Sequence, residues 1–209
     1  MIEMSKKKDG TRPLTKNDDG HFVLLCRKGD ADAFEVLVER YQKRMFNVAY
    51  RMTGDYEEAC EVVQEAFLSA YKAIRKFRGE ATFATWLTGI TMNHAKNRLK
   101  QMNARSRYEG PSIDDPVETE TGILNHEVPS PEIPVLEQLE QKEIQAKVQE
   151  CVNSLDNEYR EVLVLRDIQG FSYDEIRDIL KIPDGTVKSR LFRAREAMKI
   201  CLKKVLGDL

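Results

Sequence analysis

The residues of this 209-residue chain that could do chemistry are suited to binding rather than to catalysis. Catalysis needs nucleophiles, acids or bases that converge in one pocket. The three histidines are scattered instead, with His21 in a polar N-terminal tail, His94 in a basic segment and His126 in a proline-rich segment. The four cysteines stand far apart, whereas zinc needs clustered ligands. We therefore predict no catalytic, metal or cofactor site, and we interpret the cysteines as reduced, mostly buried thiols.

The residues best suited to bind DNA lie near the C-terminus. Between Lys181 and Leu209 there are eight Lys or Arg residues and three acidic ones. Apolar residues recur there at helical spacing, which leaves four residues on the exposed side: Lys188, Ser189, Phe192 and Arg193. Cations and hydroxyls bind base edges and phosphates, and an aromatic ring suits a thymine methyl group. Alternatively, Phe192 could be a residue at the boundary of the core.

The elements that must position these four residues form a helix-turn-helix. Ser172 and Glu175 are spaced as a capping box, which predicts the start of a short helix. The stretch 182–186 (IPDGT) predicts a tight turn, and the basic helix follows it. In a helix-turn-helix the first half of the second helix contacts the bases, and this is where the four residues lie.

A second polar stripe is expected on a long helix that begins near Phe83. One side of this helix is apolar, and the other carries Gly89, Asn93, Lys96, Asn97 and Lys100. From Lys72 to Arg107 there are nine Lys or Arg residues and one acidic residue. Such a basic segment is typical of nucleic-acid binding, although on charge alone a solvated helix face explains it equally well.

The chain as a whole is predicted to be all-α, with two small helical domains. The first domain spans residues 20–107 and follows a disordered tail at 1–19, and the second spans 135–209. Residues 108–134 hold five of the seven prolines and many acidic residues, so we interpret them as a flexible acidic linker. Such a linker predicts domains that move independently unless a partner clamps them. No apolar run is long enough to cross a membrane, and we expect a cytoplasmic protein.

Two sets of motifs resemble the extracytoplasmic-function (ECF) branch of the sigma-70 family. The first set is EVVQEAF at 61–67, FRG at 77–79 and TWL at 85–87, followed by Asn93 and Asn97, and it resembles region 2. The second set is GFSYDEI at 170–176 and GTVKSR at 185–190, and it resembles region 4. The resemblance covers roughly residues 20–107 and 135–205, and within the branch it is closest to the envelope-stress type.

The resemblance implies an RNA polymerase sigma factor, which is not an enzyme, that directs promoter-specific transcription initiation as part of a stress response. Such a protein binds core RNA polymerase and promoter DNA, and the family usually also has an anti-sigma factor. The implied polymerase-binding residues are Glu61, Gln64 and Glu65, with Glu61 standing where the family usually has Asp. The second helix of the helix-turn-helix would read the −35 element through Lys188, Ser189, Phe192 and Arg193.

The resemblance also implies that the −10 element is melted and that one flipped base is captured. Base capture is assigned to Phe77, Phe83 and Asn93, although Phe83 and Trp86 could equally be core residues. The other residues implied to bind the −10 DNA are Lys96, Asn97, Arg98 and Lys100. The main alternative is a helix-turn-helix regulator that binds DNA without being a polymerase subunit, which would leave the motifs between Glu61 and Asn97 unexplained.

Overall fold

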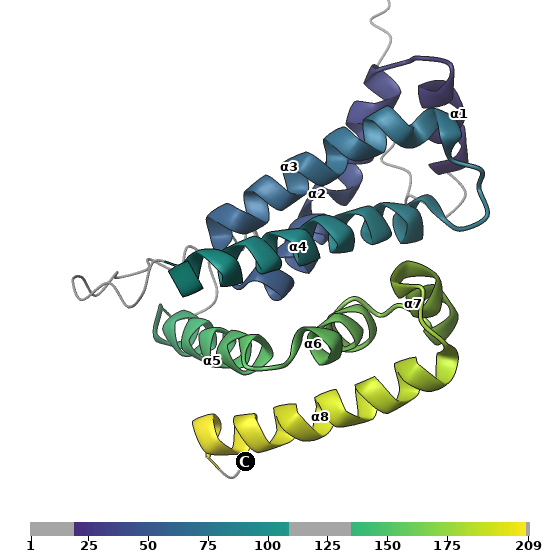
Figure 1. The fold of residues 1–209 in the computed structure, drawn as a ribbon. Helices are drawn as coiled ribbons and strands as arrows, with labels where there is room; N and C mark the ends of the chain where they lie inside the picture. Colours follow the sequence, from purple (N-terminus) through teal and green to yellow (C-terminus); the bar gives the residue numbers. More distant parts are fainter. Residues whose placement is uncertain (1–18, 109–134, 208–209) are drawn as a thin grey trace, which may run out of the picture.

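The computed structural model describes residues 19–108 and 135–207, and this part of the chain contains helices and no strand, as predicted. Figure 1 shows the helices in two stacked halves. The elements of the first half are α1 (Asp19–Arg27), α2 (Asp32–Thr53), α3 (Tyr56–Ala73), the 3-10 turn η1 (Ile74–Lys76) and α4 (Phe83–Tyr108). The elements of the second half are α5 (Val135–Asn153), α6 (Asn157–Leu163), the π-helical turn η2 (Val164–Ile168), α7 (Tyr173–Leu180) and α8 (Asp184–Leu206).

The helices of the first half begin and end at residues that satisfy their free backbone groups. Asp30 accepts a hydrogen bond from the Ala33 amide at 3.1 Å, and Asp55 accepts one from the Glu58 amide at 2.8 Å. Gly54 ends α2 with a φ of 74°, a left-handed conformation that glycine adopts without steric cost.

Helix α1 was not predicted, because its nine residues are too few for a clear periodic pattern. It buries Val23 and Cys26 in the core of the first half. Asp19, which the sequence placed in the disordered tail, binds Arg40 and Tyr41 of α2. Burial and the hydrogen bond to Asp19 raise the pKa of Tyr41, so its hydroxyl stays protonated.

The second half contains the helix-turn-helix. Ser172 and Glu175 form the predicted capping box at the start of α7, and Lys181 ends that helix in a left-handed conformation. The expected inward face of α8 is buried: Val187, Leu191, Ala194 and Met198. The Asp156 side chain makes no capping hydrogen bond to α6.

The two halves pack against each other in this structure. Independent movement of the halves, which the linker composition predicts, stays a prediction. One apolar cluster contains Met52 and Met92 from the first half together with Val152 and Val162 from the second. The guanidinium of Arg160 donates to the Met52 carbonyl at 2.6 Å across this boundary. The composition of the linker does not determine whether the two halves pack together. They pack because the apolar faces of α2 and α4 are buried against a partner surface. The predicted linker, residues 108–134, lies outside the described residues apart from Tyr108, the last residue of α4.

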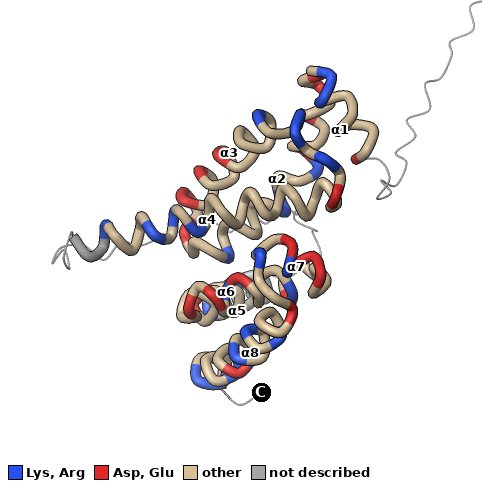
Figure 2. Tube along the Cα trace, turned by 45° about the vertical axis from the view of Figure 1, so that its right-hand side comes forward, with Lys and Arg blue, Asp and Glu red and all other residues tan. Residues whose placement is uncertain are grey.

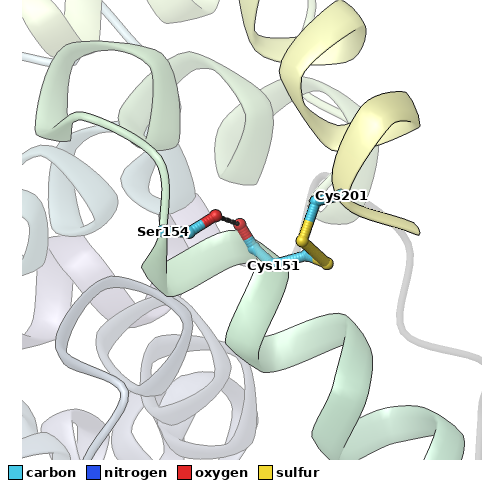
Figure 3. Close-up of a disulfide and its surroundings, with 3 residues drawn as sticks. All are labelled: Cys151, Ser154 and Cys201. Carbon is cyan, nitrogen blue, oxygen red and sulfur yellow. Dashed lines mark hydrogen bonds between the residues drawn. A yellow bond between two sulfur atoms is a disulfide. The ribbon is translucent and has the colours of Figure 1, made fainter. Parts of the chain in front are cut away.

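Two cysteines also differ from the expectation of reduced thiols. Cys151 of α5 and Cys201 of α8 form a disulfide, with their Cα atoms 5.7 Å apart (Figure 3). Cys26 is a buried free thiol and Cys60 an exposed one. The two bonded residues are 50 positions apart in the sequence, so only the packing of α5 against α8 brings them together.

Candidate nucleic-acid and polymerase interfaces

The first half of α8 presents the predicted DNA-reading residues on its solvent side. All four are exposed, and the Phe192 ring is 68% exposed, so it is not a core residue. The capping box fixes the start of α7, and the left-handed Lys181 fixes its end. The turn that follows Lys181 leads into α8. A large apolar ring held in water on this face favours a contact with another molecule.

Local contacts hold three of these four side chains. Lys188 pairs with Asp184 at 2.7 Å, and the hydrogen bond to this carboxylate raises the pKa of Lys188. Ser189 donates to the Thr186 carbonyl at 3.1 Å, and Arg193 reaches the Tyr159 hydroxyl at 3.4 Å. These contacts limit the number of rotamers that the side chains must give up when they bind DNA.

The polar face of α4 contains most of the predicted −10 residues. Asn93, Asn97 and Lys100 are exposed and recur at spacings of four and three, so they lie on one face of the helix. Lys96 belongs to the same stripe, but its Nζ lies 3.1 Å from both carboxylate oxygens of Glu161 on α6. Arg98 lies on a different side of α4, against α3.

The aromatic residues near the start of α4 form one cluster. The Phe77 and Trp86 rings lie 4.9 Å apart between centroids, and Phe83 contacts both. Phe83 is 3% exposed and belongs to the core, whereas Phe77 and Trp86 are partly exposed. The ring surface that a flipped base could reach therefore comes from Phe77 and Trp86.

The predicted polymerase-binding residues lie on the exposed face of α3. Glu61, Gln64 and Glu65 are all exposed. Figure 2 shows acidic residues along α3, while basic residues gather along the C-terminal part of α4 and on α8. Acidic and basic residues are thus concentrated on different helices.

The structure also assigns contacts to residues that the sequence did not single out. Arg160 and Glu161 are adjacent charged residues, each about 5% exposed, within the apolar stretch of α6 and η2. Arg44 of α2 donates to the Gln169 carbonyl at 2.9 Å and stacks over the Phe171 ring at 4.4 Å. The charged pair Arg160 and Glu161 in an apolar stretch could have been noticed in the sequence. The partners of these residues, however, are known only from the tertiary structure.

Family comparisons agree with both halves. A model described as "Sigma-70 region 2" matches residues 37–105, and one described as "Sigma-70, region 4" matches residues 145–198. The RNA polymerase sigma-H factor of Pseudomonas aeruginosa is 37% identical over 195 residues, which is 93% of this chain and 99% of that protein. The ECF RNA polymerase sigma-E factor of Escherichia coli K12 is 40% identical over 186 residues, which is 86% and 92% of the two chains.

Two solved structures share the fold. The structure of CnrH in complex with the cytosolic domain of CnrY has a TM-score of 0.63 at 22% identity and covers 89% of this chain and 97% of its own. The Bartonella quintana sigma factor RpoE, in complex with the anti-sigma factor NepR, has a TM-score of 0.58 at 21% identity and covers 81% and 96%.

No described helix is long and apolar enough to span a membrane. No group of three or more His, Cys, Asp or Glu residues within 19–108 and 135–207 is arranged to hold a metal ion. Both family regions, in this order and on this fold, show that the chain belongs to the ECF branch of the sigma-70 family, as an RNA polymerase sigma factor that directs promoter-specific transcription initiation.

Proposed function

We propose that this sigma factor binds −35 DNA, −10 DNA and core polymerase through three separate surfaces. The exposed stripe of α8 reads the −35 element as duplex DNA. The polar face of α4, with the partly exposed rings of Phe77 and Trp86, holds the melted −10 strand. The exposed face of α3, through Glu61, Gln64 and Glu65, binds core polymerase. We propose that the protein acts in the cytoplasm, where polymerase and promoter DNA are found.

One observation supports this division more than any other. Phe192 is 68% exposed between cations on a helix whose opposite face is fully buried. Folding alone gives no reason to keep that ring in water, whereas a thymine methyl group would cover it. Asn93 supports the second surface, because an exposed amide offers donors and an acceptor that suit a base edge.

Run-off transcription with purified core polymerase tests the proposal. Variants of α8, α4 and α3 should fail in three distinguishable ways. An α8 variant should lose selectivity for the −35 sequence, and an α4 variant should keep its defect on a template with a pre-melted bubble. An α3 variant should fail on every template because it does not enter the holoenzyme. If all three variants fail identically, the assignment to separate surfaces is wrong.

We also propose that an anti-sigma factor holds this protein inactive and that it serves a stress response. The support is that one structural neighbour named above, the Bartonella quintana sigma factor RpoE, was solved in complex with an anti-sigma factor. Proteins that co-purify with the tagged chain from its host can be added to the run-off reaction. A partner that abolishes the transcript, with rescue by excess sigma factor, supports the proposal. A bound protein without this effect contradicts it.

A further inference from the structure

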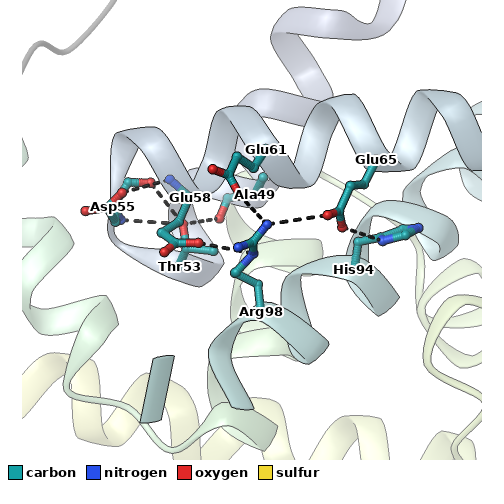
Figure 4. A network of polar contacts seen from close by, with 8 residues as sticks. All are labelled: Ala49, Thr53, Asp55, Glu58, Glu61, Glu65, His94 and Arg98. Atoms are coloured by element: carbon teal, nitrogen blue, oxygen red, sulfur yellow. Dashed lines mark hydrogen bonds and ion pairs between the residues drawn. The ribbon is translucent and has the colours of Figure 1, made fainter. Parts of the chain in front are cut away.

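Arg98 lies between α4 and the acidic face of α3, where it contacts three carboxylates (Figure 4). Its Nε is 3.1 Å from Glu58, and its second terminal nitrogen bonds Glu61 and lies 3.4 Å from Glu65. The Arg98 side chain is only 11% exposed, while Glu61 and Glu65 remain more than half exposed. The largely buried guanidinium of Arg98 therefore contacts the carboxylates of Glu61 and Glu65, which still face solvent.

The three carboxylates need such support because they lie on one side of the same helix. Residues three and four apart on a helix are neighbours, and like charges at this spacing repel each other. A guanidinium has five donors in a rigid planar fork, so it can satisfy several carboxylate oxygens at once. Each carboxylate accepts up to about four hydrogen bonds, which leaves the outward lone pairs of Glu61 and Glu65 free to accept others.

Glu65 receives a second support from α4. His94 Nδ1 lies 3.1 Å from the Glu65 carboxylate, and His94 Nε2 lies 2.9 Å from the Ser69 hydroxyl. Glu65 is thus held by Arg98 through one oxygen and by His94 through the other. Rotamers fixed in this way lose less entropy when a partner binds them.

We infer that Arg98 is a positioning residue for polymerase binding, which orients the carboxylates of Glu61 and Glu65 toward the polymerase surface. This inference rests on the proposed role of the α3 face. It replaces the expectation that Arg98 binds a −10 phosphate, since the side chain is directed at α3 and is already occupied by three carboxylates. Helix α4 then serves two partners, with its polar stripe for DNA and its α3-facing side for polymerase.

The test is Arg98→Gln in the full-length chain, with the affinity for core polymerase and for a single-stranded −10 oligonucleotide measured in parallel. Loss of charge-assisted hydrogen bonds should weaken polymerase binding about tenfold, and the affinity for the oligonucleotide should not change. Arg98→Lys should be intermediate, because a single ammonium keeps the charge but not the fork. Arg105→Gln, an exposed arginine further along α4, is the matched control and should leave polymerase binding unchanged.

A double-mutant cycle separates positioning from general damage to the fold. If Arg98 acts through Glu61, the combined loss in Arg98→Gln with Glu61→Gln should be smaller than the sum of the two single losses. Additive losses, a loss confined to the oligonucleotide, or tighter polymerase binding in Arg98→Gln would each overturn the inference. If Glu61→Gln and Glu65→Gln both leave polymerase affinity unchanged, the assignment of the α3 face fails as well. If they weaken it and Arg98→Gln does not, only the positioning role fails.

Discussion

At the scale of single residues, the two helices that we propose to bind DNA carry different side chains, which suit different states of DNA. The exposed cations of α8 suit the base edges and phosphates of a duplex, which are accessible without melting. An asparagine such as Asn93 cannot reach the pairing edge of a base until that base leaves the stack. The two helices should therefore respond differently to mutation.

Arg193→Ala should weaken binding to a −35 duplex by about 1–3 kcal/mol if the guanidinium pairs with a guanine. The loss should be much smaller on a random duplex, which lacks that base contact. Competition binding with the two duplexes measures the difference. Arg195→Ala is the control, since Arg195 is held by Asp167 at 2.6 and 2.9 Å. An equal loss on both duplexes would mean that Arg193 binds phosphate only.

Asn93→Ala should reduce the base preference of the chain for single-stranded −10 DNA. Polymerase affinity and −35 duplex affinity should not change, because the surfaces that we propose for them lie on α3 and α8. Binding to oligonucleotides that carry each of the four bases at each −10 position gives the preference. Asn47→Ala on α2 serves as the control, because the Asn47 amide donates to the Lys43 carbonyl within its own helix. An unchanged preference would make Asn93 a phosphate-binding or packing residue.

At the scale of elements, a disulfide links α5 to α8. The disulfide joins the end of α5 to the second half of α8, beyond the DNA-reading stripe. An apolar groove of about 520 Å³ lies between these helices and η2, lined in part by Val148, Val152, Met198 and Leu202. Disulfides in reducing compartments are commonly transient or redox-sensing, so the bond is expected to respond to reductant.

Reduction should lower the free energy of unfolding by about 4 kcal/mol, the loop-closure value for a bond spanning a separation of 50 residues. Urea unfolding with and without dithiothreitol measures this, and a Cys151→Ser/Cys201→Ser double variant should show no response. Identical unfolding curves in the two conditions would contradict the prediction.

In the native oxidised protein, Cys60 should be the only thiol that reacts quickly. Cys26 is buried, and burial raises the pKa of its thiol, which lowers the thiolate fraction.

At the scale of the whole molecule, the closed arrangement conflicts with simultaneous reading of both promoter elements. Twenty-five base pairs separate positions −35 and −10 by their numbering, which is about 85 Å of duplex at 3.4 Å per base pair. In the structure, Thr85 of α4 lies 3.3 Å from Glu175 of α7, and Lys96 lies 3.1 Å from Glu161. If α8 and α4 read the two elements as proposed, we expect the two halves to separate when the protein engages a promoter.

Lys96 links this opening to DNA binding, because its partner in the closed state is a carboxylate of the other half. Glu161→Gln should weaken that contact, release Lys96 and raise the affinity of the free chain for single-stranded −10 DNA by roughly two- to tenfold. Lys96→Gln should lower the same affinity, since a phosphate contact is lost. The two changes, made on the two sides of one ion pair, are thus expected to have opposite effects.

Fluorescence anisotropy with a labelled oligonucleotide is sufficient for this measurement. Glu143→Gln is the control, because its ion pair with Lys147 lies within α5 and is exposed. An unchanged or lowered affinity in Glu161→Gln would show that the closed contact does not compete with DNA.

The sequence by itself determined the all-α class, the helices other than α1, the helix-turn-helix and the family. These depend on local signals, namely periodic apolar residues, caps such as Ser172 with Glu175, and two motifs that each lie within one segment. The exposure of Lys188, Ser189 and Arg193 also followed from spacing alone.

Only the tertiary structure decided which partner each polar residue has. Helical spacing places Lys96 and Arg98 on α4. It does not predict that Lys96 pairs with Glu161, or that Arg98 contacts three carboxylates of α3. It likewise does not bring Cys151 to Cys201, or pack the apolar faces of the two halves into one cluster. The ion pairs of Lys96 and Arg98 and the disulfide join residues between 33 and 65 positions apart in the chain, and the apolar cluster joins residues as distant as Met52 and Val152, so no local pattern encodes these contacts. They form because burial of apolar surface brings distant helices together, and the polar groups left at the boundary must then find partners there.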